Sequence, residues 1–225
     1  TTLQTAEARA WAALDRAVTA APLFDGGAIA RTLAALPDGA VVFAGNSMPV
    51  RYVDAFDRPT PRQIAVYGNR GASGIDGNVS TALGLAAASG RPVVALLGDI
   101  TFYHDMNGLL AVGQHALNDV TFVVTNNDGG GIFRRLPIAR HEPPFTDLFL
   151  TPHGLTFDHA AALYGLDYAA VRDKAALEAT LARSGPAAPR LIEVITDGAA
   201  DLDHHRAVLA AVAAELQAAV ATPAH

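Results

Sequence analysis

The sequence has 225 residues, enough for one large domain or for one domain with an appendage. A formal net charge of −6 without basic runs argues against nucleic acid or an acidic membrane surface as the partner. The sequence contains no cysteine, which excludes disulfide bonds and thiol catalysis. It also has no apolar run that approaches the ~20 residues of a membrane-spanning helix. We therefore predict a cytoplasmic protein without a membrane segment.

The first residues predict a helix that stands apart from the pattern that follows. Apolar residues recur at helical spacing over Ala6–Ala20, and the chain begins abruptly at Thr1. We predict that residues 1–22 are a linker or helix from an upstream domain. Residues 23–225 are then predicted to form the main domain.

From Asp25 onward, short apolar runs alternate with helical patterns. The predicted strands cover 41–44, 64–67, 93–97, 120–124, 167–171 and 190–195. The predicted helices cover 25–36, 50–55, 78–89, 158–165, 173–184 and 201–220. Asp25 and Asp173 are each predicted to cap the helix that they begin. Strands that alternate with helices predict an α/β fold, a doubly wound, mainly parallel sheet flanked by helices.

An acidic residue and an amide residue follow two of these strands. Asp99 comes shortly after 93–97, and Asn127 comes shortly after 120–124. Because a helical pattern connects the two strands, they should pair in parallel and place both side chains at neighbouring carboxyl ends. A carboxylate, an amide oxygen and a backbone carbonyl are hard oxygen ligands that suit Mg²⁺ together with phosphate. The pattern predicts a metal-bridged phosphate at this edge of the sheet.

These residues also carry a resemblance to a known family. Gly98-Asp99 and the later pair Asn126-Asn127 resemble the GDG…NN signature of the thiamin-diphosphate enzymes. In that family the Asp, the second Asn and the carbonyl two residues later bind the metal. The resemblance implies thiamin diphosphate as cofactor, Mg²⁺ or Mn²⁺ as the metal, and Asp99, Asn127 and the carbonyl of Gly129 as its ligands.

The residues around Asp99 begin a helix and are predicted to contact the cofactor. The family usually has Gly where this chain has Ile100, a mild departure because only the backbone is needed there. Thr101 can offer its N–H and hydroxyl to a phosphate, since free N–H groups and the helix dipole attract anions at a helix start. Gly98, Ile100 and Thr101 are therefore predicted cofactor contacts.

Three further motifs narrow the resemblance to one branch of this family. They are GNSMPVR at 45–51, NRGASGIDG at 69–77 and GGGIF at 129–133. Together they are similar to the MenD family of menaquinone biosynthesis, the 2-succinyl-5-enolpyruvyl-6-hydroxy-3-cyclohexene-1-carboxylate synthases. The resemblance implies that Ile75, beside Gly74, wedges beneath the cofactor and forces it into a V shape. It also implies that Ile132 and Phe133 pack on the cofactor rings.

Three polar residues on the same rim are predicted to contact substrate. Arg pairs with carboxylates in a planar, bidentate way, and the substrates of this family are rich in carboxylates. The resemblance implies that Ser47, Arg51 and Arg70 contact isochorismate or the succinyl-derived carboxylate, and Ile75 completes the candidate catalytic set. The implied reaction decarboxylates 2-oxoglutarate and adds the succinyl-semialdehyde carbanion to isochorismate in 1,4 fashion.

The resemblance also implies partners. Enzymes of this family carry a second α/β domain, an N-terminal pyrimidine-binding domain whose Glu activates the cofactor, ordinarily from a neighbouring subunit. We expect a homo-oligomer in which that domain completes the site, and no activity from this chain alone. Neither a nucleic acid nor a membrane is an expected partner.

Two other functions stay open from the sequence. One is another thiamin-diphosphate decarboxylase or carboligase, similar to acetolactate synthase. The other is a non-catalytic, cofactor-binding module that presents the Pro-rich segment 134–157 to a partner.

Two further residues or pairs are predicted to have structural roles. Asp105 is predicted to cap a helix that begins at Met106, and the pair His204-His205 to lie on a solvated helix face.

Overall fold

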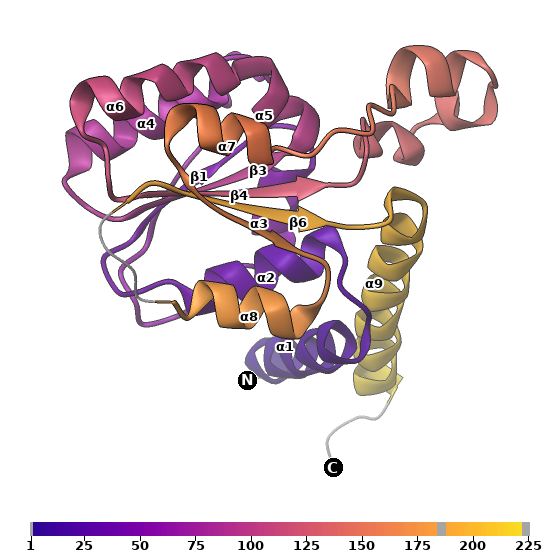
Figure 1. Cartoon of the computed structure of the whole chain (residues 1–225). Coiled ribbons are helices and arrows are strands. Elements are labelled where there is room, and N and C mark those ends of the chain that lie inside the picture. The colour runs from indigo at the N-terminus through magenta and orange to yellow at the C-terminus, as the bar shows by residue number, and fades with distance from the viewer. Residues whose placement is uncertain (1, 184–187, 222–225) are drawn as a thin grey trace.

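The computed structural model describes residues 2–183 and 188–221. Its centre is a six-stranded sheet in the order β2-β1-β3-β4-β6-β5, and every pairing is parallel (Figure 1). The strands are β1 (Val41–Ala44), β2 (Ala65–Tyr67), β3 (Val93–Gly98), β4 (Val120–Asn126), β5 (Asp167–Val171) and β6 (Arg190–Ile195). The predicted doubly wound, parallel α/β fold is confirmed.

Helices cover both faces of this sheet. They are α1 (Thr2–Ala20), α2 (Asp25–Ala35), α3 (Met48–Phe56), α4 (Asn78–Ser89), α5 (Asp99–Asp105), α6 (Leu110–His115), α7 (Asp158–Tyr164), α8 (Lys174–Leu181) and α9 (Gly198–Ala221). In Figure 1, α4 to α7 lie above the sheet, and α2, α3 and α8 lie below it. None of the described helices combines the length and the apolar character that crossing a bilayer requires.

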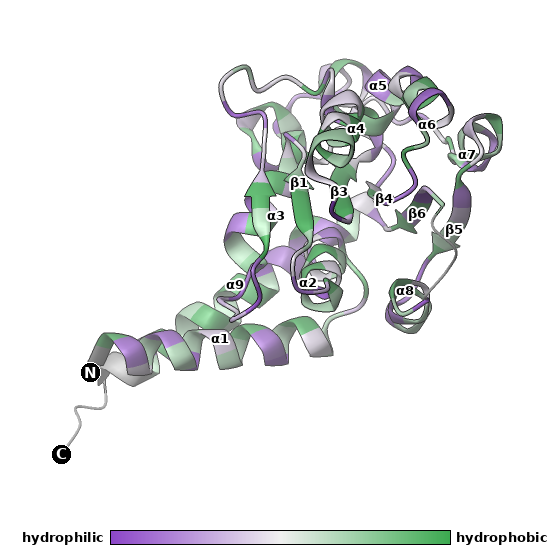
Figure 2. Cartoon of the chain, turned by 90° about the vertical axis from the view of Figure 1, so that its left-hand side faces the viewer, coloured by the Kyte–Doolittle hydropathy of each residue, from purple (hydrophilic) through white to green (hydrophobic). Residues whose placement is uncertain are grey.

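Side chains of the central strands alternate between two apolar layers. Val42, Leu96 and Ile192 belong to the cluster that contains α2, α3 and α8, whereas Phe43 and Phe122 belong to the cluster that contains α4 and α5. Each of these five side chains is at most 1 % exposed. Figure 2 shows the resulting band of hydrophobic strands between the helices. Continuous apolar strands are typical of the centre of a parallel sheet that is covered on both faces, because the central strands do not face water.

Most of the predicted elements are confirmed. The strands β1, β5 and β6 coincide with the predicted ranges, and the other strands differ by one or two residues. Asp173 caps α8 as predicted, because its carboxylate accepts the N–H of Ala176 at 2.8 Å. The helix α8 ends at Leu181, and Ser184, its predicted end, lies outside the described residues.

Three smaller predictions are wrong. Asp25 does not cap α2; it is the first residue of that helix, and its carboxylate bonds to side chains far along the sequence. Asp105 does not cap a helix at Met106, because its carboxylate accepts the N–H and the hydroxyl of Ser80 and so joins α5 to α4. His205 is not solvated, since only 8 % of it is exposed.

The two terminal helices pack against each other below the sheet (Figures 1 and 2). Arg9 and Arg16 of α1 both pair with Glu215 of α9, at 2.9 and 3.2 Å. Leu14 faces the apolar cluster under the sheet and is buried. The predicted domain boundary at residue 22 stays a prediction.

The Pro-rich segment 134–157 projects from the sheet edge, at the upper right of Figure 1. It contains a 3₁₀ turn at Pro137–Arg140 and a single π turn at Phe145–Leu150, and a further 3₁₀ turn at Gly131–Arg135 leads into it. The prolines therefore interrupt regular structure here, as the sequence predicted.

Candidate functional site

The strand ends gather the predicted site residues at one edge of the sheet. Because all strands run parallel, their carboxyl ends meet at this edge, and the winding direction reverses between β1 and β3. Ser47 follows β1, Asp99 follows β3 and Asn127 follows β4. Open α/β sheets bind their ligands at such a switch point.

A cavity of about 320 Å³ opens at this edge. Its lining includes eleven of the predicted residues, which are Ser47, Gly74, Ile75, Gly98, Asp99, Ile100, Thr101, Asn127, Gly129, Ile132 and Phe133. Asp25 and Thr125 also line it, although the sequence did not suggest them. Arg51 and Arg70 do not contribute to the lining.

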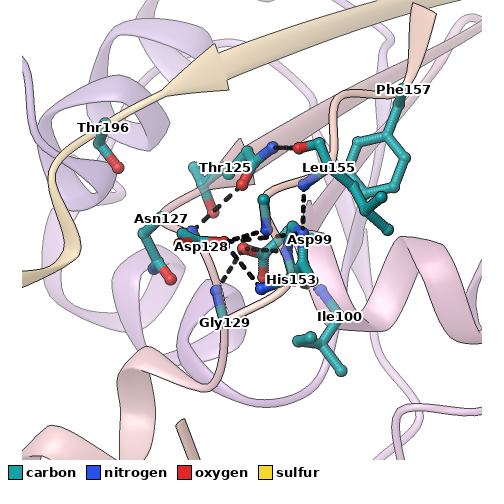
Figure 3. Close-up of polar contacts among 12 residues, drawn as sticks. Asp99, Ile100, Thr125, Asn127, Asp128, Gly129, His153, Leu155, Phe157 and Thr196 are labelled. Atoms are coloured by element: carbon teal, nitrogen blue, oxygen red, sulfur yellow. Dashed lines mark hydrogen bonds and ion pairs between the residues drawn. The ribbon is translucent and has the colours of Figure 1, made fainter. Parts of the chain in front are cut away.

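The carboxylate of Asp99 is held from both sides and is 2 % exposed. Its Oδ1 accepts the N–H of Ile100 at 2.7 Å, and its Oδ2 accepts the N–H of Gly129 at 2.9 Å. Oδ2 also faces Nε2 of His153 at 3.2 Å (Figure 3). A carboxylate oxygen can accept two hydrogen bonds, so Oδ1 keeps a lone pair for a further ligand.

Asn127 lines the same cavity as Asp99, and no bond is drawn to its amide oxygen in Figure 3. Nδ2 donates a hydrogen bond to Oδ2 of Asp25 at 2.6 Å. Oδ1 is buried and has no hydrogen-bond partner among the residues that the structure describes. A buried acceptor without a partner costs about 1–3 kcal/mol and is rare in native proteins. The amide oxygen is therefore a strong candidate for ligand binding.

The turn after Asn127 requires glycine at position 129. Gly129 has a φ of 133°, and a Cβ there would lie 2.1 Å from the backbone oxygen of Leu150. This close approach of the backbone to Leu150 allows a hydrogen bond at the next residue: Gly130 donates its N–H to the same oxygen at 2.7 Å. The carbonyl of Gly129 accepts the N–H of Gly131 at 2.9 Å and keeps its second lone pair.

The end of the Pro-rich segment is tied onto this turn, which the sequence did not indicate. Oδ1 of Asp128 accepts the N–H groups of Gly154 and His153, at 2.7 and 2.9 Å, and these bonds lower the pKa of Asp128. Nδ1 of His153 accepts the N–H of Leu155 at 2.9 Å, so in the neutral ring Nε2 carries the proton that faces Asp99. The hydrogen bond to Asp99 raises the pKa of His153, against the effect of burial.

Two buried amides hold the Gly-rich segment 69–77 at the cavity. Nδ2 of Asn46 and Nδ2 of Asn78 both donate to the carbonyl of Gly74, at 2.6 and 3.2 Å. Oδ1 of Asn78 in turn accepts the backbone N–H of Asn46 at 3.2 Å. The neighbouring Ile75 is thereby fixed in the cavity wall.

The two arginines lie on the rim with exposed side chains. Nη1 of Arg70 donates to Oδ1 of Asn46 at 2.7 Å, and Nη1 of Arg51 donates to the carbonyl of Ser47. Ser47 itself has a φ of 70°, a conformation that is uncommon outside glycine and typical of functional turns. The contacts of these three residues with a substrate stay predictions.

The carboxyl group of Asp25 lies beneath the metal-binding candidates and is 1 % exposed. Its Oδ1 accepts the hydroxyl of Thr196 at 2.6 Å, and its backbone N–H donates to Oδ1 of Asp201 at 2.8 Å. Burial raises the pKa of Asp25 far above its ordinary value, and the nearby carboxylate of Asp201 raises it further. Sequence patterns could not reveal this residue, because its partner Asn127 lies 102 residues away.

Comparison with known families fits this geometry. Residues 46–194, well over half of the chain, match the model of the thiamine pyrophosphate (TPP) enzymes, C-terminal TPP binding domain. The chain belongs to this family. Thiamine pyrophosphate is thiamin diphosphate, the cofactor that the GD…NN resemblance implied. The TPP domain therefore places its cavity at the strand ends where the signature residues meet.

Similar proteins agree with the predicted branch of the TPP enzymes. The chain is 53% identical over 211 residues to the 2-succinyl-5-enolpyruvyl-6-hydroxy-3-cyclohexene-1-carboxylate synthase of Roseiflexus castenholzii, which covers 93% of this chain and 36% of that protein. It is 50% identical to the synthase of Halobacterium salinarum, over 86% of this chain and 33% of that protein. The predicted resemblance to the C-terminal portion of the MenD family is confirmed, and the chain spans about a third of these relatives' length.

A solved structure supports the fold of the TPP domain. The crystal structure of benzoylformate decarboxylase from Polynucleobacter necessarius superimposes with a TM-score of 0.64. The superposition covers 80% of this chain and 34% of that chain at 24% sequence identity. This likeness concerns the arrangement of strands and helices.

The residues of the TPP domain fit a metal-bound diphosphate. In the part of the chain that the structure describes, no group of three or more His, Cys, Asp or Glu side chains is placed to hold a metal ion. The predicted ligands at this edge are instead one carboxylate, of Asp99, with the amide oxygen of Asn127 and the carbonyl of Gly129. Such neutral oxygen donors suit a cation that also binds water and substrate phosphates.

Proposed function

We propose that this chain holds the diphosphate of thiamin diphosphate through Mg²⁺, bound by Asp99, Asn127 and the backbone carbonyl of Gly129. The observation that carries the proposal is the buried amide oxygen of Asn127, which has no partner of its own among the described residues, in the cavity that the oriented carboxylate of Asp99 also lines. A cation would satisfy both oxygens. Mn²⁺ has the same preference for oxygen ligands and is expected to substitute for Mg²⁺.

The rest of the cavity is proposed to bind the remainder of the cofactor. Gly98, Ile100 and Thr101, at the start of α5, supply contacts to the diphosphate. Ile75 supports the cofactor from below. Ile132 and Phe133 make further apolar contacts with the cofactor, and Gly74 lets the cofactor approach the backbone. The support for these roles is that all of these residues line one cavity.

The whole enzyme is proposed to decarboxylate 2-oxoglutarate and to add the succinyl unit to isochorismate. The support is the identity of 50% and 53% to synthases that carry the name of this reaction's product. When bound, the cofactor supplies the electron sink for decarboxylation. The chain's own residues orient the reactants, with Ser47, Arg51 and Arg70 proposed to bind substrate carboxylates.

The proposed enzyme needs a partner domain. A pyrimidine-binding domain, contributed within a homo-oligomer, is proposed to supply the acidic residue that activates the cofactor. This chain alone is then expected to bind metal and diphosphate but to release no product. The cytoplasmic location stays a prediction.

Binding of the cofactor tests the site directly. We expect thiamin diphosphate to bind in the presence of Mg²⁺, measured by isothermal titration calorimetry, and the binding to be lost in Asp99→Ala because a charged metal ligand is removed. Asp105→Ala is the matched control on the same helix; its carboxylate contacts Ser80, so stability should fall while affinity is kept. Equal affinity in Asp99→Ala and the natural protein would refute the metal assignment.

Turnover distinguishes the proposed reaction from its alternatives. With the complementary domain supplied, release of carbon dioxide from 2-oxoglutarate should be coupled to the consumption of isochorismate. Release from pyruvate but not from 2-oxoglutarate would instead indicate an enzyme similar to acetolactate synthase. Cofactor binding without turnover of any keto acid would indicate a binding module.

A further inference from the structure

The orientation of one amide decides whether the proposed cation finds an oxygen at Asn127. The side chain of Asn127 carries an oxygen and an NH₂ group at equivalent positions, and rotation by 180° exchanges them. Only the oxygen can bind a cation, since the NH₂ group is a pure donor. Something in the fold must therefore select the productive orientation.

Asp25 is placed to make this selection. Its Oδ2 accepts a hydrogen bond from Nδ2 of Asn127 at 2.6 Å, and its Oδ1 accepts one from Thr196 at 2.6 Å. With Asp25 ionised, a reversed amide of Asn127 would place two acceptor oxygens against each other at this distance. Asp25 itself is anchored, because its backbone N–H donates to Asp201 at 2.8 Å and its surface is 1 % exposed.

Close packing around Asn127 leaves its amide no room to move away from Asp25. A Cβ on Gly131 would lie 2.8 Å from Nδ2 of Asn127 and 3.2 Å from its Oδ1. A Cβ on Gly198 would lie 2.5 Å from the backbone oxygen of Asn127. The starts of α2 and α9 and the turn after β4 therefore enclose this residue, and the hydrogen bond to Asp25 decides which atom faces the site.

We propose that Asp25 is a positioning residue, which turns the amide of Asn127 so that its oxygen faces the cation of the cofactor. The inference rests on the proposed metal site and deepens it. Asp25 does not touch the metal; it acts through Asn127 alone. Partners of metal ligands commonly have this task, and their loss costs about 10- to 100-fold in metal affinity.

The test measures Mn²⁺ affinity by electron paramagnetic resonance, with thiamin diphosphate present and without turnover. Asp25→Ala should weaken Mn²⁺ binding by about 10-fold or more, because the hydrogen bond that orients the amide of Asn127 is lost. Asp25→Asn should restore the affinity to within roughly threefold, since its oxygen can accept from Asn127 and its NH₂ can donate to Thr196. A loss in Asp25→Asn as large as that in Asp25→Ala would overturn the orientation argument.

A matched variant separates positioning from a general loss of structure. Asp173 also lies at the start of a helix, and its carboxylate caps α8 away from the cavity. Asp173→Ala should lower the unfolding temperature and leave Mn²⁺ affinity unchanged. If Asp173→Ala weakened Mn²⁺ binding as much as Asp25→Ala does, the effect would be structural and the inference would fail.

A second readout needs no metal at all. In the metal-free protein, nuclear magnetic resonance follows the exchange of the side-chain NH₂ protons of Asn127 with solvent. Asp25→Ala should speed this exchange, whereas Asp25→Asn should keep it slow, and equal rates in all three proteins would refute the contact. If the natural protein binds no Mn²⁺, the proposed function fails together with this inference. Normal binding in Asp25→Ala would overturn the inference alone.

Discussion

His205 lies on α9, with only 8 % of its surface exposed. Its ring meets the rings of Tyr52 and Phe56 edge to face, with centroids 5.6 and 5.9 Å away. Burial, together with the positive charge of Arg135, lowers the pKa of His205 to about 4. The fold therefore accommodates the neutral ring, although histidine in an unfolded chain titrates near pH 6.5.

The low pKa of His205 predicts a stability that depends on pH. Between pH 6.5 and 4 the unfolded state binds a proton at this residue and the folded state does not, so the free energy of unfolding falls as the pH falls. We expect this contribution to amount to about 2–3 kcal/mol across the window. His205→Phe keeps an aromatic ring and should remove it.

Urea unfolding of both proteins at pH 7, 5.5 and 4.5 provides the measurement. The difference between the natural protein and His205→Phe isolates this residue, because the other titrating groups are common to both. As the pH falls, the free energy of unfolding of the natural protein should fall relative to that of His205→Phe. A difference that is constant with pH would mean that His205 keeps its ordinary pKa.

At the scale of elements, the start of α4 organises the Gly-rich segment. Gly77, with a φ of 67°, precedes the helix, and the first helical residue is Asn78, which is fully buried. The amide of Asn78 donates to the carbonyls of Gly74 and Asp76 and accepts the backbone N–H of Asn46. One side chain thus joins the turn after β1 to the segment that carries the proposed wedge.

Removal of this amide should loosen the segment. Asn78→Ala leaves the buried N–H of Asn46 without its acceptor, and we expect the free energy of unfolding to fall by about 2 kcal/mol. Asn107→Ala is the control, because its oxygen only meets the hydroxyl of Tyr164 at 3.4 Å on the surface; its effect should stay within about 0.5 kcal/mol. Equal effects of the two substitutions in urea unfolding would contradict this role of Asn78.

At the scale of the whole molecule, two apolar layers stabilise the sheet, whereas the ion pairs between the terminal helices lie at the surface. The contact between α1 and α9 contains both kinds of interaction. Leu14 is buried in the layer below the sheet, while Arg9 and Arg16 reach Glu215 from exposed positions. Exposed ion pairs contribute little because water screens them.

This contrast predicts unequal effects of two substitutions in the same helix pair. Leu14→Ala should lower the free energy of unfolding by about 2–4 kcal/mol, since it leaves a cavity in the core. Glu215→Ala should lower it by less than about 1 kcal/mol, although it removes two ion pairs. Thermal unfolding of both variants measures which one loses more stability. A larger loss in Glu215→Ala would show that ion pairs, more than apolar packing, hold α1 in place.

Much of the fold could be predicted because its signals are local. The runs 41–44 and 190–195 are short and mainly apolar, and both are strands with the predicted bounds. Asp99 and Asn127 follow such strands, so parallel pairing brings them to one edge and into one cavity. The family signature is local as well, and the match to the TPP enzymes confirms it.

The remaining features depend on contacts between residues that are far apart in the sequence. Asp25 looks like a helix cap because Asp often begins a helix, but its partners Asn127 and Thr196 are 102 and 171 residues away. His153 carries no motif, and only the folded chain brings it to Asp99. Arg70 lies on the predicted rim, yet the fold directs one of its nitrogens to Asn46.

The sequence by itself determined the class of fold, the order of its elements and the edge where a cofactor would bind. It could do so because the hydrophobic period and the strand-end residues are properties of short segments. Only the tertiary structure decided which atom of Asn127 is free, which groups surround it and which ionisable side chains are buried. These depend on the packing of α2, α9 and the turn after β4 against one another, and no short segment contains that information.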